Sequence, residues 1–288
     1  MTQPLEIIET FKVRQSARTF NGKNFPQNKM QKVQEIINEV NQLETPFKLN
    51  HVEIAVTKPG LGKMGFISNE TGWIVEKIKK NSESKESPTK EEIIDASFRM
   101  QIAVMKMTQN HITTVWIGGT YNRGKAAKRY NNEYHVPIGV AFGDKEAPHF
   151  MAKVVKLFKN SRERLPFEKL FYDSKRNQVV DETLLNSYNS KTKDFIESLR
   201  SGPSSMNGQP WRFALFFNDD DGEQEMITHV NLYNAASDDF SSFFSMGIAL
   251  GNVYFMKEVL NNQFEVSVKN PTPSPTPVGG DYVCTITI

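Results

Sequence analysis

The sequence has only one cysteine, Cys284, among its 288 residues. A single thiol excludes a disulfide within the chain. Because Cys284 lies in the apolar end segment DYVCTITI, we expect a buried and unreactive thiol. Hydrophobic residues make up 38% of the chain, which suffices for a folded core, and the length is compatible with one large domain or two ordinary ones.

Long apolar runs are also missing from the sequence. No stretch approaches the roughly 18 to 20 apolar residues that a membrane-spanning helix needs. The first residues, MTQPLEIIETF, lack both the basic and the apolar region of a signal peptide. We therefore expect a globular, cytoplasmic protein with no membrane partner.

Neither sign of charge dominates, because 35 Lys and Arg residues face 33 Asp and Glu residues for a net charge of +2. Nucleic-acid binding needs a clustered basic excess, so we expect no nucleic-acid partner, and any anion site has to be local. The five histidines show no metal-ligand spacing, and no metal site is expected. The charged stretches 78–93 and 218–225 are predicted to be solvated loops, the second a hairpin tip.

Regular apolar patterns are present instead. Helical spacing of apolar residues predicts helices at 5–11, 30–40, 89–105, 151–158, 193–199 and 237–254. The third helix has an N-cap signature in Ser87, Pro88, Thr89 and Glu92. Apolar segments at 51–56, 135–144, 211–217 and 281–288 predict strands, the second of them central. Residues 62–78 are predicted to form a hairpin or an edge segment.

A turn that displays polar groups occupies residues 201–210 and runs into the strand-like WRFALFF. Gly and Pro fix the dihedral angles of such turns, and Ser and Asn side chains bond their own backbone. The hydroxyl groups of Ser204 and Ser205 and the amide of Asn207 can therefore be exposed at a sheet edge. From these arguments alone, an ordinary helix-to-strand loop is an equally good interpretation.

Two basic segments have alternating arginines. Arg14, Ser16 and Arg18 share one face if their segment is extended, and guanidinium groups match phosphate oxygens bidentately. Arg162 and Arg164 alternate in the same way. The alternative interpretation is surface arginines at a helix end and a solvated basic turn. Between these segments, Gly118 and Gly119 allow another group to approach the backbone closely.

These motifs together resemble the FMN-dependent nitroreductase family. P-S-S-x-N-x-Q-P-W-x-F at 203–213 is similar to the most distinctive motif of that family, and R-x-S-x-R-x-F at 14–20 to its N-terminal phosphate motif. R-x-R-L-P at 162–166 resembles a second basic pair, in which the family usually has Lys at the first position. W-x-G-G at 116–119 is similar to a flavin-facing segment. The resemblance covers nearly the whole chain and is nearest to the single-chain nitroreductase subgroup.

The resemblance implies an FMN cofactor and a role for each motif. It implies no catalytic side chain, because the chemistry belongs to the flavin. It places an amide of Gly118 or Gly119 at flavin N5, and Pro203, Ser204, Ser205 and Asn207 against the ring. The phosphate would be held by Arg14, Ser16, Arg18, Arg162 and Arg164.

The resemblance also implies an α+β fold, an α/β sandwich with mixed antiparallel sheets covered by helices. The order helix, loop, strand and apolar-stripe helix occurs in 25–143 and again in 185–288, which indicates an internal duplication. The phosphate motifs lie in one half (1–175) and the P-S-S-x-N motif in the other (176–288). We therefore expect residues 1–288 to form one pseudo-dimeric unit, a monomer with one complete site.

The predicted function is an NAD(P)H-dependent flavin oxidoreductase. NADPH or NADH would reduce the flavin, which would then reduce a nitroaromatic, quinone or related small-molecule acceptor in a ping-pong reaction. The alternative is a non-catalytic flavin-binding or interaction protein on the same scaffold. Other flavin chemistries, such as dehalogenation or dehydrogenation, are a third hypothesis.

Overall fold

The computed structural model describes residues 3–22, 25–80, 87–146, 163–220, 225–237, 239–260, 262–269 and 279–288. The chain divides into two compact units, Met1–Arg162 and Glu163–Ile288. This division falls earlier than the expected one after residue 175, because the short strand β6 (Phe171–Asp173) pairs in parallel with β8 (Trp211–Phe217) of the second unit. The predicted helix at 151–158 lies outside the described residues.

The first unit is built on an antiparallel sheet with the order β1-β2-β5-β3. Its strands are β1 (Val52–Thr57), β2 (Gly72–Lys79), β3 (Thr113–Ile117) and β5 (Gly139–Gly143), and the short β4 (Tyr134–His135) pairs with the end of β2. The prediction of a hairpin or edge segment at 62–78 is wrong for β2, which lies inside the sheet between β1 and β5. Residues 72–76 of β2 are all buried, so both faces of this strand are covered, as expected of an interior strand.

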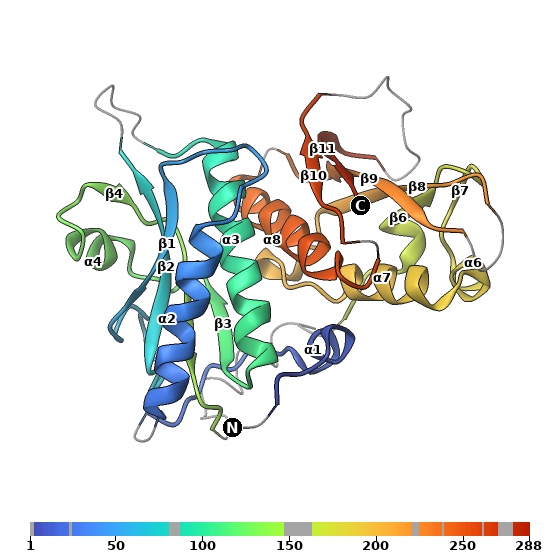
Figure 1. Cartoon of the computed structure of the whole chain (residues 1–288). Coiled ribbons are helices and arrows are strands. Elements are labelled where there is room, and N and C mark those ends of the chain that lie inside the picture. Colours follow the sequence, from blue (N-terminus) through green and yellow to red (C-terminus); the bar gives the residue numbers. More distant parts are fainter. Residues whose placement is uncertain are drawn as a thin grey trace. The chain divides into compact units, whose positions relative to one another are not determined.

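Two long helices lie side by side against one face of this sheet (Figure 1). Helix α2 (Gln27–Asn41) buries its predicted apolar residues Val33, Ile36, Ile37 and Val40. Helix α3 (Lys90–Gln109) begins at the predicted cap, where the Thr89 side chain accepts from Glu92 N and the Glu92 carboxylate accepts from Thr89 N. Most residues of α3 are buried, so this helix forms the centre of the unit.

The opposite face of the sheet is covered by irregular chain. Trp73 and Val75 point to this side and pack in a cluster with Leu61, Tyr121 and Phe20. The short helices α1 (Ile7–Val13) and α4 (Arg123–Lys128) belong to the same unit. The sheet therefore supports three segments on this side, residues 17–20, 61–67 and 121–127.

The second unit has a six-stranded sheet with the order β10-β11-β9-β8-β6-β7. Its core contains the stacked rings of Phe171 and Phe213, 5.3 Å apart, and the fully buried Cys284. The prediction of a buried thiol is confirmed, and burial raises the pKa of Cys284. The remaining elements are β7 (Gln178–Val179), α6 (Glu182–Ser187), α7 (Ser190–Arg200), β9 (Ile227–Asn234), α8 (Phe240–Met256), β10 (Glu265–Ser267) and β11 (Asp281–Thr287).

The two units repeat one topology. The succession α2, β1, β2, α3, β3, β5 in the first unit matches α7, β8, β9, α8, β10, β11 in the second. Strand order agrees as well, since β1-β2-β5-β3 corresponds to β8-β9-β11-β10, with every adjacent pair antiparallel. The predicted α+β fold and its internal duplication are confirmed. Among the helices described, none is long and apolar enough to cross a membrane.

Candidate functional site

The predicted N-terminal motif runs beside strand β3. Ser16 forms a parallel bridge with Thr114, and Ala17 N donates to Thr114 O at 3.3 Å. Arg14, Ser16 and Arg18 are half-buried. The sheet therefore holds this segment in an extended form, as the alternating motif requires.

Arg18 is a half-buried cation. Burial lowers the pKa of its guanidinium. Within the described part of the chain, that guanidinium has no hydrogen-bond or ion-pair partner, and only the Arg18 carbonyl is bonded, by Ser68 N at 3.1 Å. Withdrawing a charge from water without a counter-charge is unfavourable. The position is thus suited to an anion that supplies the missing acceptors.

Gly118 and Gly119 follow directly after β3. A Cβ atom on Gly119 would meet no heavy atom within 4 Å, and one on Gly118 would meet only Ile138 Cδ1, at 3.6 Å. Neither residue has a positive φ angle. Neither dihedral angle nor internal packing therefore requires glycine at these positions, and the Gly119 backbone is exposed.

The predicted polar turn has a strained backbone. Met206, Asn207 and Gln209 have φ angles of 52°, 58° and 47°, in the left-handed region that side chains other than glycine rarely adopt. Ser204 Oγ accepts from Gln209 N at 3.0 Å, and Ser205 N donates to Ser245 Oγ of α8 at 3.2 Å. Such strain persists only where the surroundings impose it, and it is concentrated at functional sites.

Arg164 is the residue that holds this turn. Its guanidinium donates to Asn207 Oδ1 at 2.9 Å and to Ser201 O at 3.0 Å. The Asn207 amide in turn donates to Glu163 O at 2.9 Å, and Gln209 Oε1 accepts from Leu165 N at 3.0 Å. Burial, with a smaller contribution from Arg200, lowers the pKa of Arg164. Arg164, predicted to bind the FMN phosphate, thus contacts Asn207, which is predicted to lie against the flavin ring.

Comparison with known proteins identifies the family. The profile of a family described as "Putative TM nitroreductase" matches residues 6–256. The chain belongs to this nitroreductase family. No curated protein matches it.

One solved structure shares this fold over the whole chain, and others are similar to about half of it. A protein of Thermotoga maritima described as a putative nitroreductase is 14% identical, with a TM-score of 0.59 over 100% of this chain and 95% of its own. A Staphylococcus epidermidis protein described as a putative NAD(P)H:FMN oxidoreductase is 14% identical, covers 52% of this chain and 92% of its own, and has a TM-score of 0.41. A Desulfitobacterium hafniense nitroreductase with bound FMN is 15% identical, covers 50% of this chain and 94% of its own, and has a TM-score of 0.36.

The predicted site residues of this nitroreductase fall into two groups. Arg162 lies outside the described residues. The first unit holds the R-x-S-x-R segment and the glycine pair, and the second holds Arg164 with the turn. Beside β3 lie Arg14, Ser16, Arg18, Gly118 and Gly119, and in or next to the turn lie Arg164, Pro203, Ser204, Ser205 and Asn207.

Sequence reasoning assigned no role to Gln209 or Ser245. Gln209 is 3% exposed and bonds Leu165, Glu163 and Asn207 through its side chain. Its place in the Q-P-W part of the family motif was the available signal. Ser245 lies on α8, and nothing in the sequence relates it to the turn.

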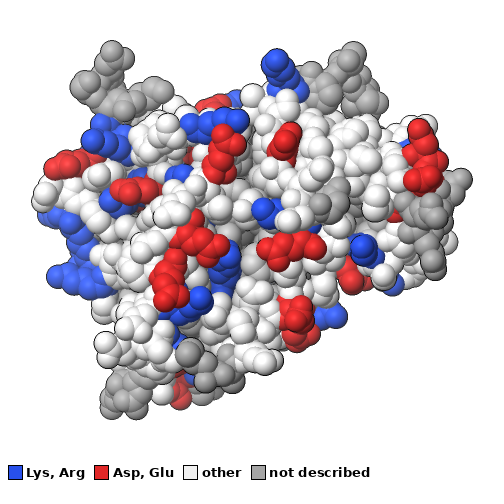
Figure 2. All heavy atoms as spheres, in the orientation of Figure 1, with Lys and Arg blue, Asp and Glu red and all other residues white. Residues whose placement is uncertain are grey.

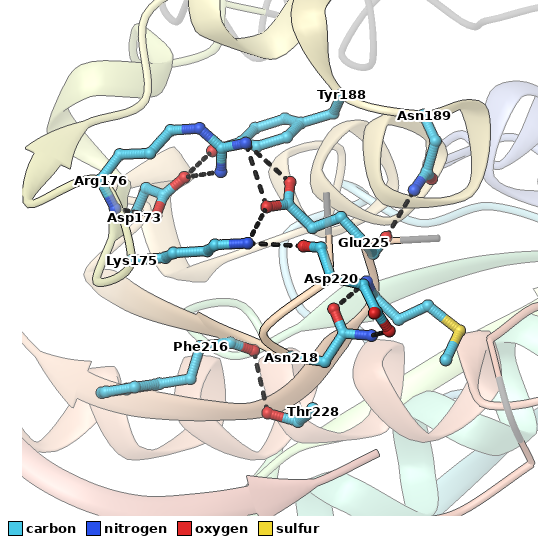
Figure 3. Close-up of polar contacts among 11 residues, drawn as sticks. Asp173, Lys175, Arg176, Tyr188, Asn189, Phe216, Asn218, Asp220, Glu225 and Thr228 are labelled. Carbon is cyan, nitrogen blue, oxygen red and sulfur yellow. Dashed lines mark hydrogen bonds and ion pairs between the residues drawn. The ribbon is translucent and has the colours of Figure 1, made fainter. Parts of the chain in front are cut away.

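A second polar cluster in this nitroreductase lies around Arg176 (Figure 3). Arg176 donates to both carboxylate oxygens of Glu225, at 3.1 and 2.9 Å, and to Asp173 at 2.8 Å. Burial acts to lower the pKa of Arg176, but the bonds to Glu225 and Asp173 raise it overall. Tyr188 donates to Asp173 at 2.6 Å. Since each carboxylate here has a cation, the cluster is a structural support.

Proposed function

We propose that this nitroreductase is an FMN-dependent oxidoreductase that takes electrons from NADPH or NADH. The acceptors would be nitroaromatic compounds, quinones or related small molecules. The observation that carries the proposal is the strained turn, in which three residues other than glycine are left-handed within the P-S-S-x-N-x-Q-P-W motif. Such strain at the family's most distinctive motif supports a binding site at this turn.

The residues present fit the cofactor. Arg18 is a half-buried guanidinium with no acceptor among the described residues, which suits a phosphate dianion. Arg14 and Ser16 lie in the same extended segment beside β3. We assign phosphate binding to these three residues, with Arg162 and Arg164 as the further predicted ligands.

Ring binding is assigned to the turn and to the glycine pair. Pro203, Ser204, Ser205 and Asn207 would orient the ring, and the accessible backbone of Gly118 and Gly119 would donate an amide to it. Bound FMN would supply the redox chemistry, accepting a hydride from the nicotinamide and passing it to the acceptor in a second half-reaction. The protein contributes orientation and electrostatics, and we assign no side chain as acid or base.

The division of the motifs between the two units supports one site per chain. Neither unit alone contains both the R-x-S-x-R segment and the P-S-S-x-N turn. We propose that residues 1–288 act as a fused pseudo-dimer in a cytoplasmic monomer.

The test is the visible spectrum of the purified protein and its FMN content, followed by anaerobic addition of NADPH and NADH. We expect one FMN per chain and bleaching of the flavin band by a reduced nicotinamide. A bound flavin that neither donor reduces would favour the non-catalytic alternative. No flavin uptake in excess FMN would refute both assignments.

A further inference from the structure

The loop between β1 and β2 lies directly beside the glycine pair. Lys63 N donates to Thr120 O at 2.8 Å, and Asn122 N donates to Leu61 O at 2.8 Å. Gly62 and Tyr121 form an isolated bridge between these two hydrogen bonds. The backbone of Lys63 is therefore bonded to the residue that follows Gly119.

Six cations gather on this loop and on α4, and we call them the cation cluster. Figure 2 shows blue side chains collected at the edge of the molecule where Figure 1 places α4. Five of the six side chains are exposed, and that of Arg129 is half-buried. The cation cluster consists of Lys58, Lys63, Arg123, Lys125, Lys128 and Arg129.

Three members of the cation cluster support the local backbone. Arg129 donates to Pro59 O at 2.8 Å and to Thr57 Oγ1 at 3.1 Å. Lys125 Nζ donates to Gly60 O at 2.7 Å, and Arg123 Nε to Pro137 O at 2.8 Å. All these acceptors are neutral, so the hydrogen bonds position the cations without compensating their charge.

The other three members have free ammonium groups. The Nζ atoms of Lys58, Lys63 and Lys128 make no hydrogen bond or ion pair within the described residues. The nearby acid Glu70 is already engaged, because one of its oxygens accepts from Gly60 N at 2.8 Å and from Trp73 Nε1 at 2.9 Å. Among the described residues, no carboxylate therefore forms an ion pair with a member of the cation cluster.

Several lysines elsewhere in the same unit are paired with carboxylates. Lys29 bonds Asp144 and Lys106 bonds Glu39 at 2.8 Å. Lys32 and Lys48 each pair with a glutamate on the same stretch of chain. Like charges raise the free energy of a surface unless an anion neutralises them. In a chain of net charge +2, the cluster is therefore a local feature that favours an anionic ligand.

We infer that the cation cluster binds the phosphate monoester on the adenosine ribose of NADPH, which makes NADPH the preferred electron donor over NADH. This inference rests on the proposed function, in which the Gly118–Gly119 backbone bonds the flavin ring that accepts the hydride from the nicotinamide. The cation cluster begins at Lys63, whose backbone bonds Thr120, the residue after Gly119. It continues to α4, where Lys125 bonds the carbonyl of Gly60. Lys and Arg side chains with free donors are the usual ligands of such a phosphate.

The first experiment compares the two donors on the FMN-loaded full chain. We expect kcat/KM for flavin reduction to favour NADPH by roughly tenfold or more. The triple variant Lys58→Gln, Lys63→Gln, Lys128→Gln should lose this preference while NADH reduction stays within about twofold. These lysines hold no backbone group, so the variant retains the fold.

The matched control removes the same charge from paired lysines. Lys32→Gln, Lys48→Gln and Lys90→Gln, each next to a glutamate, should leave the NADPH to NADH ratio at its wild-type value. An equal loss of preference in both triple variants would show a general effect of net charge and overturn the inference. So would equal use of the two donors by the wild type.

A binding measurement gives a readout without turnover. Adenosine 2′,5′-bisphosphate and adenosine 5′-monophosphate are titrated into the flavin-free protein by calorimetry. Tighter binding of the bisphosphate that is abolished in the cluster variant and kept in the control supports the inference. This holds even if neither NADPH nor NADH reduces the flavin, because that failure would count only against the proposed function. Equal binding of the two nucleotides overturns the inference.

Discussion

At the scale of single residues, Glu76 is buried where ionisation of its carboxyl group is unfavourable. Glu76 lies in β2 with no exposed surface, its Oε1 accepts from Ser97 Oγ at 2.7 Å, and its Oε2 has no partner among the described residues. Burial raises the pKa of Glu76 to about 8, against the opposing effect of the Ser97 hydrogen bond. Glu76 is therefore protonated at neutral pH.

The pKa of Glu76 predicts how stability depends on pH. A group whose folded-state pKa is raised stabilises the fold below its unfolded pKa, near 4.5, and this stability is lost as the pH rises through about 8. Between pH 5 and pH 9 the wild type should lose several kcal/mol of unfolding free energy, at about 1.4 kcal/mol per pKa unit. Glu76→Gln, which cannot ionise, should not lose it in urea titrations.

The control for this prediction is Glu53→Gln on the neighbouring strand β1. The Glu53 side chain is 44% exposed and pairs with Lys77, so this variant should keep the pH dependence of the wild type. A Glu76→Gln protein that loses as much stability as the wild type at pH 9 would show that Glu76 is ionised in the fold.

Arg164 allows a second prediction at this scale, because phosphate binding and support of the turn have different consequences. Riboflavin lacks the phosphate. If Arg164 acts through Asn207, Arg164→Lys should weaken FMN and riboflavin binding by the same factor, roughly tenfold, since a lysine cannot replace both guanidinium bonds. Fluorescence titration of both flavins, with the visible circular dichroism of the bound flavin, measures this.

Two other arginines calibrate the comparison. Arg18→Ala should weaken FMN binding by roughly 1.5–3 kcal/mol and leave riboflavin binding unchanged. Arg212 donates to Gln209 O and Trp211 O next to the same turn, and Arg212→Lys controls for a general disturbance there. A selective loss of FMN affinity in Arg164→Lys would assign Arg164 to the phosphate.

At the scale of elements, the cluster around Arg176 fixes the β6–β7 turn to the start of β9. Arg176→Met would leave Asp173 and Glu225, which are 0% and 3% exposed, without their shared cation. We expect a loss of about 3–5 kcal/mol in unfolding free energy. Lys175→Met, which removes the longer contact to Glu225, should cost about 1 kcal/mol or less. Equal losses in chemical denaturation would contradict the central role of Arg176.

Elements also show how far sequence reasoning reaches. Helices α2, α3 and α8 and strands β8 and β11 could be predicted, because their apolar periodicity and caps are local signals. The interior position of β2 could not, since strand neighbours depend on pairing between distant segments. The parallel pairing of β6 with β8 was missed for the same reason. In the candidate site, motif similarity gave the residues, whereas the contact of Arg164 with Asn207 depends on packing across 43 positions of sequence.

At the scale of the whole molecule, the division of the motifs predicts stoichiometry. We expect one FMN per chain and a particle mass near the 32.8 kDa of the chain, measured by light scattering with flavin absorbance. Two independent full sites in an ordinary homodimer would instead give twice the mass. Two FMN per chain, or a dimer whose flavin is lost on dilution to monomers, would contradict a complete site within one chain.

The repeated topology of the two units has an evolutionary consequence. In an assembly of two identical chains, every substitution is made twice and both copies of a surface must tolerate it. Here the strand pair β1-β2 and its counterpart β8-β9 are encoded separately. A substitution in one sheet therefore leaves the other sheet unchanged. Each half can then specialise while the other half keeps the inherited architecture.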